Sequence, residues 1–262
     1  MLASVRRLFG ISSNTDPFRS VAGNQAGPLM HTRPIGAMAG LMDGSPATDT
    51  ILAANWVKTL GSGTITTVDG HPATIQMVTA ATGDAVTSME QSKDFGTTVW
   101  KPCQMSATDK LWARFRINLA SALNGGLLLG FSNSATSNIF GTSGSTGTIG
   151  SGITDFVGFW KAHNTTTLSA VVRKASTSTT QTLTGYTLAD ATYALLDVVV
   201  DDGTKEVNFY FNGVNVFCQT TTTNFPLTST NLTLRASVQT NTTTARTLTL
   251  QRAFAWQESQ AA

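Results

Sequence analysis

Apolar and polar residues alternate in many short runs along this chain. In the clearest run Leu111, Ala113, Phe115 and Ile117 occupy every second position. Every second side chain of a β-strand points to the same face, so this run predicts a strand with one buried face. Further alternating or apolar runs predict strands at residues 64–68, 74–78, 127–131, 156–160, 168–174, 193–200, 207–211, 214–218, 232–238 and 248–256.

Turn signals separate nearly all of these runs. Residues 201–204 read Asp-Asp-Gly-Thr, and Asn212-Gly213 joins two of the predicted strands. Gly, and Asn more readily than most residues, adopts the positive φ that tight hairpins need. Consecutive short strands joined by such turns are typical of two packed antiparallel sheets. We therefore predict an all-β, two-sheet antiparallel sandwich with very little helix.

The first 50 residues show neither the helical nor the strand period. We expect residues 1–50 to form an extended arm and residues 51–262 to form one β-sandwich. The moderate apolar content of the arm predicts that it lies against another surface. The residues expected to make that contact are Arg6, Arg7, Phe9, Leu29, Met30, Ile35, Met38 and Leu41. Within the sandwich, residues 141–152 are rich in Gly, Ser and Thr and predict a flexible loop.

Composition narrows the classes of partner. Charged residues make up only 12% of the chain and the net charge is +2, so no overall field favours nucleic acid or an anionic membrane. No apolar stretch approaches the roughly 20 residues of a membrane helix. The two cysteines, Cys103 and Cys218, are too few for a disulfide scaffold, and we expect both to be free thiols.

Residues for metal binding or nucleophilic catalysis are sparse. The three histidines lie far apart and none is near a cysteine, so we expect no metal site. No Gly-x-Ser-x-Gly segment occurs to present a nucleophile. We expect no cofactor and no enzymatic activity, although folding could bring together residues that are distant in sequence.

Glycoside hydrolysis is also disfavoured. It needs two carboxylates about 5–10 Å apart. The three glutamates are Glu90, Glu206 and Glu258, and none lies in a strand of alternating acids. Asp197, Asp201 and Asp202 cluster at a predicted hairpin, where turn formation and solvation are favoured over catalysis or calcium binding.

The strand that begins at Leu111 carries a candidate contact patch on its other face. Trp112, Arg114 and Arg116 share that face. Together they could contact a protein or a carbohydrate. A tryptophan in a sandwich is more often buried in the core or an interface than stacked on a ligand, and both interpretations stay open here.

Several segments resemble those of a known domain type. They are LWARFRI at 111–117, DFVGFWK at 155–161, YALLDVVVD at 193–201, EVNFYFNGV at 206–214 and the closing run at 248–256. From about Trp56 to Trp256 their order resembles concanavalin-like, laminin-G-like jelly-roll domains. The resemblance implies a jelly-roll sandwich. It is weakly specific for function, because lectins, glucanases, adhesion modules and phage proteins share this scaffold.

The overall layout, from the lead-in before LWARFRI to the final RAFAWQ, resembles tailed-phage structural proteins that coat the outside of the capsid. That resemblance implies a capsid decoration or cement protein on the virion, made in the host cytoplasm. Its expected partners are the major capsid protein and sister subunits, in a homo-oligomer such as a trimer. The alternative is a glycan-binding module of a tail fibre or host-adhesion apparatus.

Overall fold

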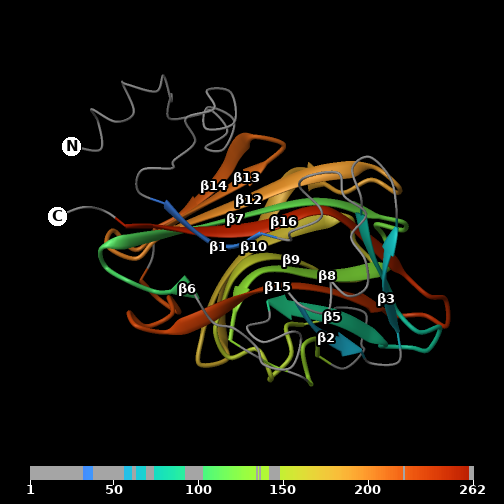
Figure 1. Ribbon diagram of the computed structural model, residues 1–262. Helices are drawn as coiled ribbons and strands as arrows, with labels where there is room; N and C mark the ends of the chain where they lie inside the picture. The colour runs from blue at the N-terminus through green and yellow to red at the C-terminus, as the bar shows by residue number, and fades with distance from the viewer. Residues whose placement is uncertain are drawn as a thin grey trace.

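The computed structural model describes residues 32–37, 56–60, 63–68, 74–91, 103–133, 135, 137–141, 148–220 and 222–259. These residues form sixteen β-strands and no helix. The strands make two sheets of eight that pack face to face, and every strand pair is antiparallel (Figure 1). The predicted two-sheet antiparallel sandwich is confirmed.

Sheet A has the order β14-β13-β12-β7-β16-β4-β3, with β1 paired to β16. In that order its strands are Val214–Gln219, Glu206–Phe211, Tyr193–Asp201, Asp109–Leu119, Thr247–Ser259, Thr74–Val78 and Thr64–Val68, and β1 is Thr32–Ala37. The long strand β16 pairs with β7 along one side. Its other side pairs with β4 at residues 247–250 and with β1 at residues 254–258.

Sheet B has the order β11-β10-β9-β8-β15-β5-β2, with β6 paired to β15. In that order its strands are Thr177–Thr187, Thr167–Lys174, Phe156–Lys161, Gly125–Ser132, Asn231–Thr240, Val86–Gln91 and Trp56–Leu60, and β6 is Cys103–Gln104. Every strand predicted from the sequence is observed. Strands β1, β2, β5, β6 and β11 were not predicted.

The core lies between the two sheets and is built largely from alternate residues of long central strands such as β7, β8 and β15. Leu111, Ala113, Phe115 and Ile117 of β7 are buried in it, as the alternation predicts. Phe159 of β9 and Phe209 of β13 join the layers, because their ring centroids lie 5.3 Å apart in an edge-to-face arrangement. Such aromatic pairs stabilise a fold beyond the apolar area that they bury.

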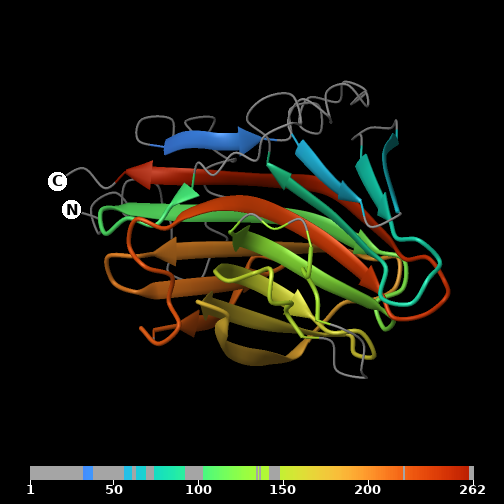
Figure 2. The same cartoon turned by 90° about the horizontal axis from the view of Figure 1, so that it is seen from below.

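The segment expected to be an arm contributes one strand to the sandwich. Residues 32–37 form β1 and pair with residues 254–258 of β16, with a bulge between Pro34 and Gly36. Figure 2 shows β1 beside β16 at the upper rim. The other residues of 1–50 lie outside the described part of the chain. The N-terminal segment therefore includes a strand that the lack of periodicity did not reveal.

Candidate functional site

The outer face of sheet A carries the predicted patch. Trp112, Arg114 and Arg116 alternate with the buried residues of β7, so they lie on the face turned away from sheet B. Trp112 is half-buried and Arg116 is exposed, but only 6% of Arg114 is exposed. The three residues share a face as predicted, yet they do not form a continuous exposed surface.

Arg114 is held by an acid on the neighbouring strand. Asp197 lies directly opposite it on β12 and is fully buried. Arg114 donates from Nε to Asp197 Oδ1 at 2.7 Å and from Nη2 to Asp197 Oδ2 at 2.8 Å. This two-bond geometry is the strongest form of an arginine–carboxylate pair. Asp197 therefore does not belong to the hairpin cluster in which the sequence placed it. It joins two strands in the middle of sheet A.

Arg116 is the exposed member of the patch. Its guanidinium carbon lies 5.1 Å from the ring centroid of Tyr193 on β12. Tyr193 is itself 37% exposed. A cation over an aromatic face is attracted by the negative centre of the ring. Arg116 and Tyr193 together make a small basic and aromatic surface at one end of β7.

Asp201 has the turn-forming role that the sequence favours, but the predicted solvation is wrong, because Asp201 and Asp202 are both buried. Asp201 accepts hydrogen bonds from the backbone N–H groups of Gly203 and Thr204, and it pairs with Lys110 at 2.8 Å. Burial alone would raise the pKa of Asp201, but the hydrogen bonds from Lys110 and Thr204 and the Lys110 charge outweigh it and hold the pKa below its usual value. Asp202 forms an ion pair with Lys205.

Part of the outer face of sheet B is covered by the chain itself. Between β8 and β9 the described residues 133, 135, 137–141 and 148–155 form a loop, whose ends meet where Asn133 N donates to Asp155 O at 3.0 Å and Asp155 N donates to Asn133 Oδ1 at 3.1 Å. Apolar residues of this loop and of the sheet face form a second buried cluster. Its members are Leu128, Ala135, Ile139, Phe140, Ile149, Ile153, Phe156 and Val171. We call these described residues between β8 and β9 the covering loop.

Composition predicts a flexible loop at 141–152, and residues 142–147 of that stretch lie outside the described part of the chain, so the flexibility stays a prediction. The described residues at its two ends pack closely against their neighbours. Gly150 N donates to Ile139 O at 2.9 Å and Gly152 N donates to Asn138 O at 3.0 Å. Arg173 of β10 donates to Gly150 O at 3.3 Å. Glycine lets the backbone segments come this close, because an added Cβ at Gly150 or Gly152 would collide with the carbonyl oxygens of Asn138 and Ser137.

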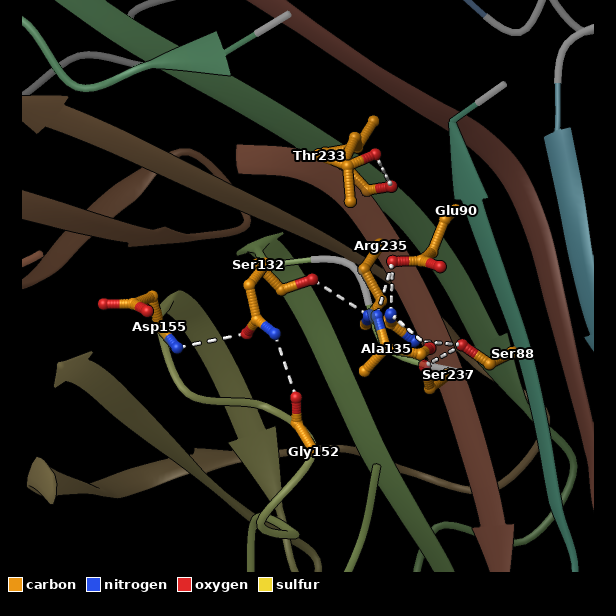
Figure 3. A network of polar contacts seen from close by, with 11 residues as sticks. Ser88, Glu90, Ser132, Ala135, Gly152, Asp155, Thr233, Arg235 and Ser237 are labelled. Carbon is orange, nitrogen blue, oxygen red and sulfur yellow. Dashed lines mark hydrogen bonds and ion pairs between the residues drawn. The ribbon is translucent and has the colours of Figure 1, made fainter. Parts of the chain in front are cut away.

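A network of charged and hydroxyl side chains lies beneath the covering loop (Figure 3). Arg235 of β15 pairs with Glu90 of β5, and neither side chain is exposed. Arg235 Nε donates to Ser132 Oγ at 2.9 Å and Nη1 donates to Ser88 Oγ at 2.7 Å. Ser88 and Ser237 share a hydrogen bond of 2.6 Å. Burial lowers the pKa of Arg235, while the Glu90 charge acts in the opposite direction.

The network also fastens the covering loop to the sheet. Arg235 Nη2 donates to Ala135 O at 2.9 Å, and Ala135 N donates to Glu90 Oε1 at 3.3 Å. One backbone unit of the loop thus contacts both members of the ion pair. The loop therefore contributes one hydrogen bond to each member of the buried pair, and moving the loop away would cost both of them.

Sequence reasoning missed this network. Arg235 is the one charged residue in the strand NLTLRASVQT, and Glu90 lies in a run that alternates only weakly. A single charge within an apolar strand is a signal that its partner is buried beside it. Nothing in the sequence identifies Glu90 as that partner, since the two residues meet only through the pairing of β5 with β15.

Among the described residues, no group of three or more His, Cys, Asp or Glu side chains could hold a metal ion. Cys103 is buried and Cys218 is exposed, and both are free thiols as expected. Burial raises the pKa of the Cys103 thiol, which disfavours the thiolate form that acts as a nucleophile. The described part of the chain contains no helix long and apolar enough to span a membrane.

The predicted contacts of the arm are mostly outside the described residues. Ile35 lies in β1, at the bulge between Pro34 and Gly36. The remaining members, Arg6, Arg7, Phe9, Leu29, Met30, Met38 and Leu41, lie in segments that the structure does not describe. Their contact role stays a prediction.

The chain matches no family model and no curated protein. Three solved structures with similar folds are the carbohydrate recognition domain of Emp47p, a conserved carbohydrate esterase of Shiga toxin-encoding bacteriophage phi24B, and an alginate lyase of Corynebacterium sp.. The fold is a concanavalin-like jelly roll.

These likenesses extend over most of each chain. For Emp47p the TM-score is 0.54 at 9% identity, covering 88% of this chain and 98% of that one. For the phage protein the TM-score is 0.50 at 11% identity, covering 87% of this chain and 100% of that one. For the alginate lyase the TM-score is 0.50 at 15% identity, covering 80% of this chain and 96% of that one. At these identities the likeness concerns the fold alone.

Proposed function

We propose that this chain is a non-enzymatic structural protein of a tailed-phage virion, which binds the outer surface of the head and stabilises it. The observation that carries the proposal is the covered centre of the outer face of sheet B. This centre is filled by the covering loop and by the buried Arg235–Glu90 pair. Side chains buried in this way stabilise the fold and are not available to bind a substrate there.

The state of the acidic side chains supports a role without catalysis. Glu90, Asp197, Asp201 and Asp202 each form an ion pair with a lysine or arginine. General acid or base catalysis needs a carboxyl group that can exchange a proton with substrate. Carboxylates fixed to cations inside a sheet or a turn serve the fold instead.

The position of β1 supports contact through the N-terminal segment. Because β1 pairs with β16, residues before Thr32 join the body of the protein at sheet A. Apolar residues such as Leu29 and Met30 directly precede this strand in the sequence. A segment tethered to the sandwich in this way can bind a capsid surface without carrying a fold of its own. The likeness to a bacteriophage protein adds that phages use this fold.

Particle composition tests the proposal. Heads purified from the phage that encodes the chain should carry it in hundreds of copies, counted by quantitative mass spectrometry, and heads prepared without it should regain it on mixing with the full chain. A variant that lacks residues 2–31 keeps β1 and should fold but no longer sediment with heads. A handful of copies per particle, or absence from particles, would overturn the decoration role.

A second candidate function is glycan binding in a tail fibre or adhesion apparatus. Exposed Tyr193, with Arg116 over its ring, favours it because sugars stack on exposed aromatic rings. The likeness to a domain described as carbohydrate recognition points the same way. A glycan array with the full chain tests it: binding that Tyr193→Ala abolishes and Leu227→Ala, an exposed control, preserves would favour this candidate. An array without binding would remove it.

A further inference from the structure

The outer edge of sheet B is formed by β11, which pairs with β10 and with no other described strand. Figure 2 shows this edge at the lower rim of the molecule. Between Thr177 and Thr182 the ladder with β10 is regular, and Thr180, Gln181 and Thr182 are exposed. A free strand edge presents unpaired backbone groups to other chains.

The hairpin that joins β10 to β11 shows which backbone groups point outward. Ala175 and Ser176 form a two-residue turn, and both have positive φ, at 47° and 67°. In such a hairpin the closing residues, here Lys174 and Thr177, exchange hydrogen bonds, and hydrogen-bonded pairs then alternate along the ladder. The N–H and C=O groups of Ser178, Thr180 and Thr182 therefore face away from β10.

The other described edges carry features that oppose pairing with a second chain. Strand β14 contains a bulge opposite Tyr210, and β1 contains Pro34 and a bulge. Strand β2 contains Lys58 and has five residues, and β3 also has five. Charges, proline, bulges and short length are the usual protections of an edge strand. The run from Thr177 to Thr182 has no charge, no proline and no bulge.

We propose that two copies of this chain associate by antiparallel pairing of β11 with β11, so that sheet B continues from one copy into the other. A two-fold axis at Thr180 places that residue opposite its own copy and Ser178 opposite Thr182. The three outward residues then form about six hydrogen bonds between the copies. An uncharged strand is suited to this arrangement, since it brings no like charges together, and Thr–Thr pairs across strands are favourable.

The small size of this contact sets its strength. A six-residue edge buries less than the roughly 1,600 Å² of a standard stable interface. The dimer should therefore form at high concentration and dissociate on dilution. Copies held side by side on a shell would pair more readily, because attachment raises their effective concentration. The pairing itself does not depend on capsid attachment, so either proposal can fail without the other.

Introducing a charge at Thr180 tests the register. Sedimentation velocity of the full chain over a concentration series should show a monomer that converts to a dimer. Thr180→Lys and Thr180→Glu should each stay monomeric where the wild type is dimeric, because each variant places two like charges opposite one another. An equimolar mixture of the two should restore the dimer. Thr184→Lys, an exposed change outside the regular ladder, should dimerise like the wild type.

Hydrogen exchange gives a second measurement. The amides of Ser178, Thr180 and Thr182 should exchange more slowly as the concentration of the wild type rises, and should not do so in Thr180→Lys. A wild type that remains monomeric at its highest attainable concentration would overturn the proposal. So would a trimer, or a dimer that Thr180→Lys leaves intact.

Discussion

At the scale of single residues, the buried Arg235–Glu90 pair has to offset the free energy that is lost when two charges leave water. Moving two charges out of water is expensive, and their mutual attraction offsets this only when the remaining donors and acceptors are satisfied. Here Ser88, Ser132 and the backbone of Ala135 supply those contacts. The net gain in stability from the pair is therefore small. Its main effect is to fix one arrangement of β5, β15 and the covering loop.

Breaking the pair from one side should be severe. Arg235→Met leaves the Glu90 carboxylate buried without its cation, and we expect the free energy of unfolding to fall by about 3–5 kcal/mol. Replacing both members, Arg235→Met with Glu90→Leu, should recover much of that loss. Chemical denaturation measures both, and the exposed change Arg116→Met should cost about 1 kcal/mol or less. A double variant no better than the single one would contradict this account.

Lys161 should make stability depend on pH. Burial lowers the pKa of this side chain to about 7, with Asp190 opposing the shift, and its Nζ donates to the carbonyls of Ala162 and Thr165. The folded state then binds fewer protons than the unfolded state above pH 7. The contribution of Lys161 is therefore least favourable below pH 7 and improves as pH rises from about 7 towards 10.5.

The comparison that isolates this effect uses Lys161→Met. The difference in unfolding free energy between the wild type and this variant should shift in favour of the wild type as the pH is raised from 7 to 10. Denaturant titrations at several pH values measure it, with Lys174→Met on the neighbouring strand as the control. A difference that stays constant across this range would show that Lys161 keeps an ordinary proton affinity.

At the scale of elements, the sequence predicted strands wherever one face is apolar. Strand β7 alternates strictly, and its apolar residues are the buried ones. Strands β5 and β11 were missed because their few apolar residues, Val86 and Met89 in VTSMEQ and Leu183 and Tyr186 in TSTTQTLTGYT, do not recur at every second position. One face of β5 is polar because it holds Glu90 under the covering loop, and β11 is polar because it forms an edge. Alternation cannot reveal either situation.

The close approach of β8 and β9 is a second feature of element packing. Gly130 and Gly158 lie opposite each other, and a Cβ added at Gly130 would lie 2.3 Å from Val157 O and 2.7 Å from Gly158 Cα. Both obstacles are backbone atoms, so the strands would have to separate. Gly130→Ala should therefore destabilise the protein by about 1–3 kcal/mol or more.

A matched glycine variant makes that prediction specific. Gly83 has no atom within 4 Å of its added Cβ, so Gly83→Ala should leave the unfolding free energy nearly unchanged. Thermal and denaturant unfolding of the two variants gives the comparison. Equal effects at both positions would mean that β8 and β9 can move apart at little cost.

At the scale of the whole molecule, the division into an arm and a sandwich determines how the chain can be shortened. The pattern placed the boundary near residue 50, but β1 lies before it and extends sheet A. Periodicity could not find this strand, because TRPIGA has only six residues and includes a proline and a glycine. Its pairing with β16 depends on a partner more than two hundred residues away in the sequence.

Two truncations should therefore behave differently. Removing residues 2–31 keeps β1, and the unfolding free energy should match that of the full chain. Removing residues 2–37 exposes the edge of β16 at residues 254–258. The loss of several hydrogen bonds, each contributing about 0.5–1.5 kcal/mol, should lower stability by about 2 kcal/mol or more.

The uncovered edge has a further consequence that separates the two truncations. Residues 254–258 read FAWQE, an apolar and aromatic segment, and an unprotected strand edge of this kind pairs with other chains. The 2–37 truncation should aggregate at concentrations where the 2–31 truncation does not, as light scattering would measure. If the two truncations showed equal unfolding free energy and equal light scattering, the pairing of residues 32–37 with β16 would contribute nothing to stability. A ladder of backbone hydrogen bonds would contribute, so that result would contradict the pairing.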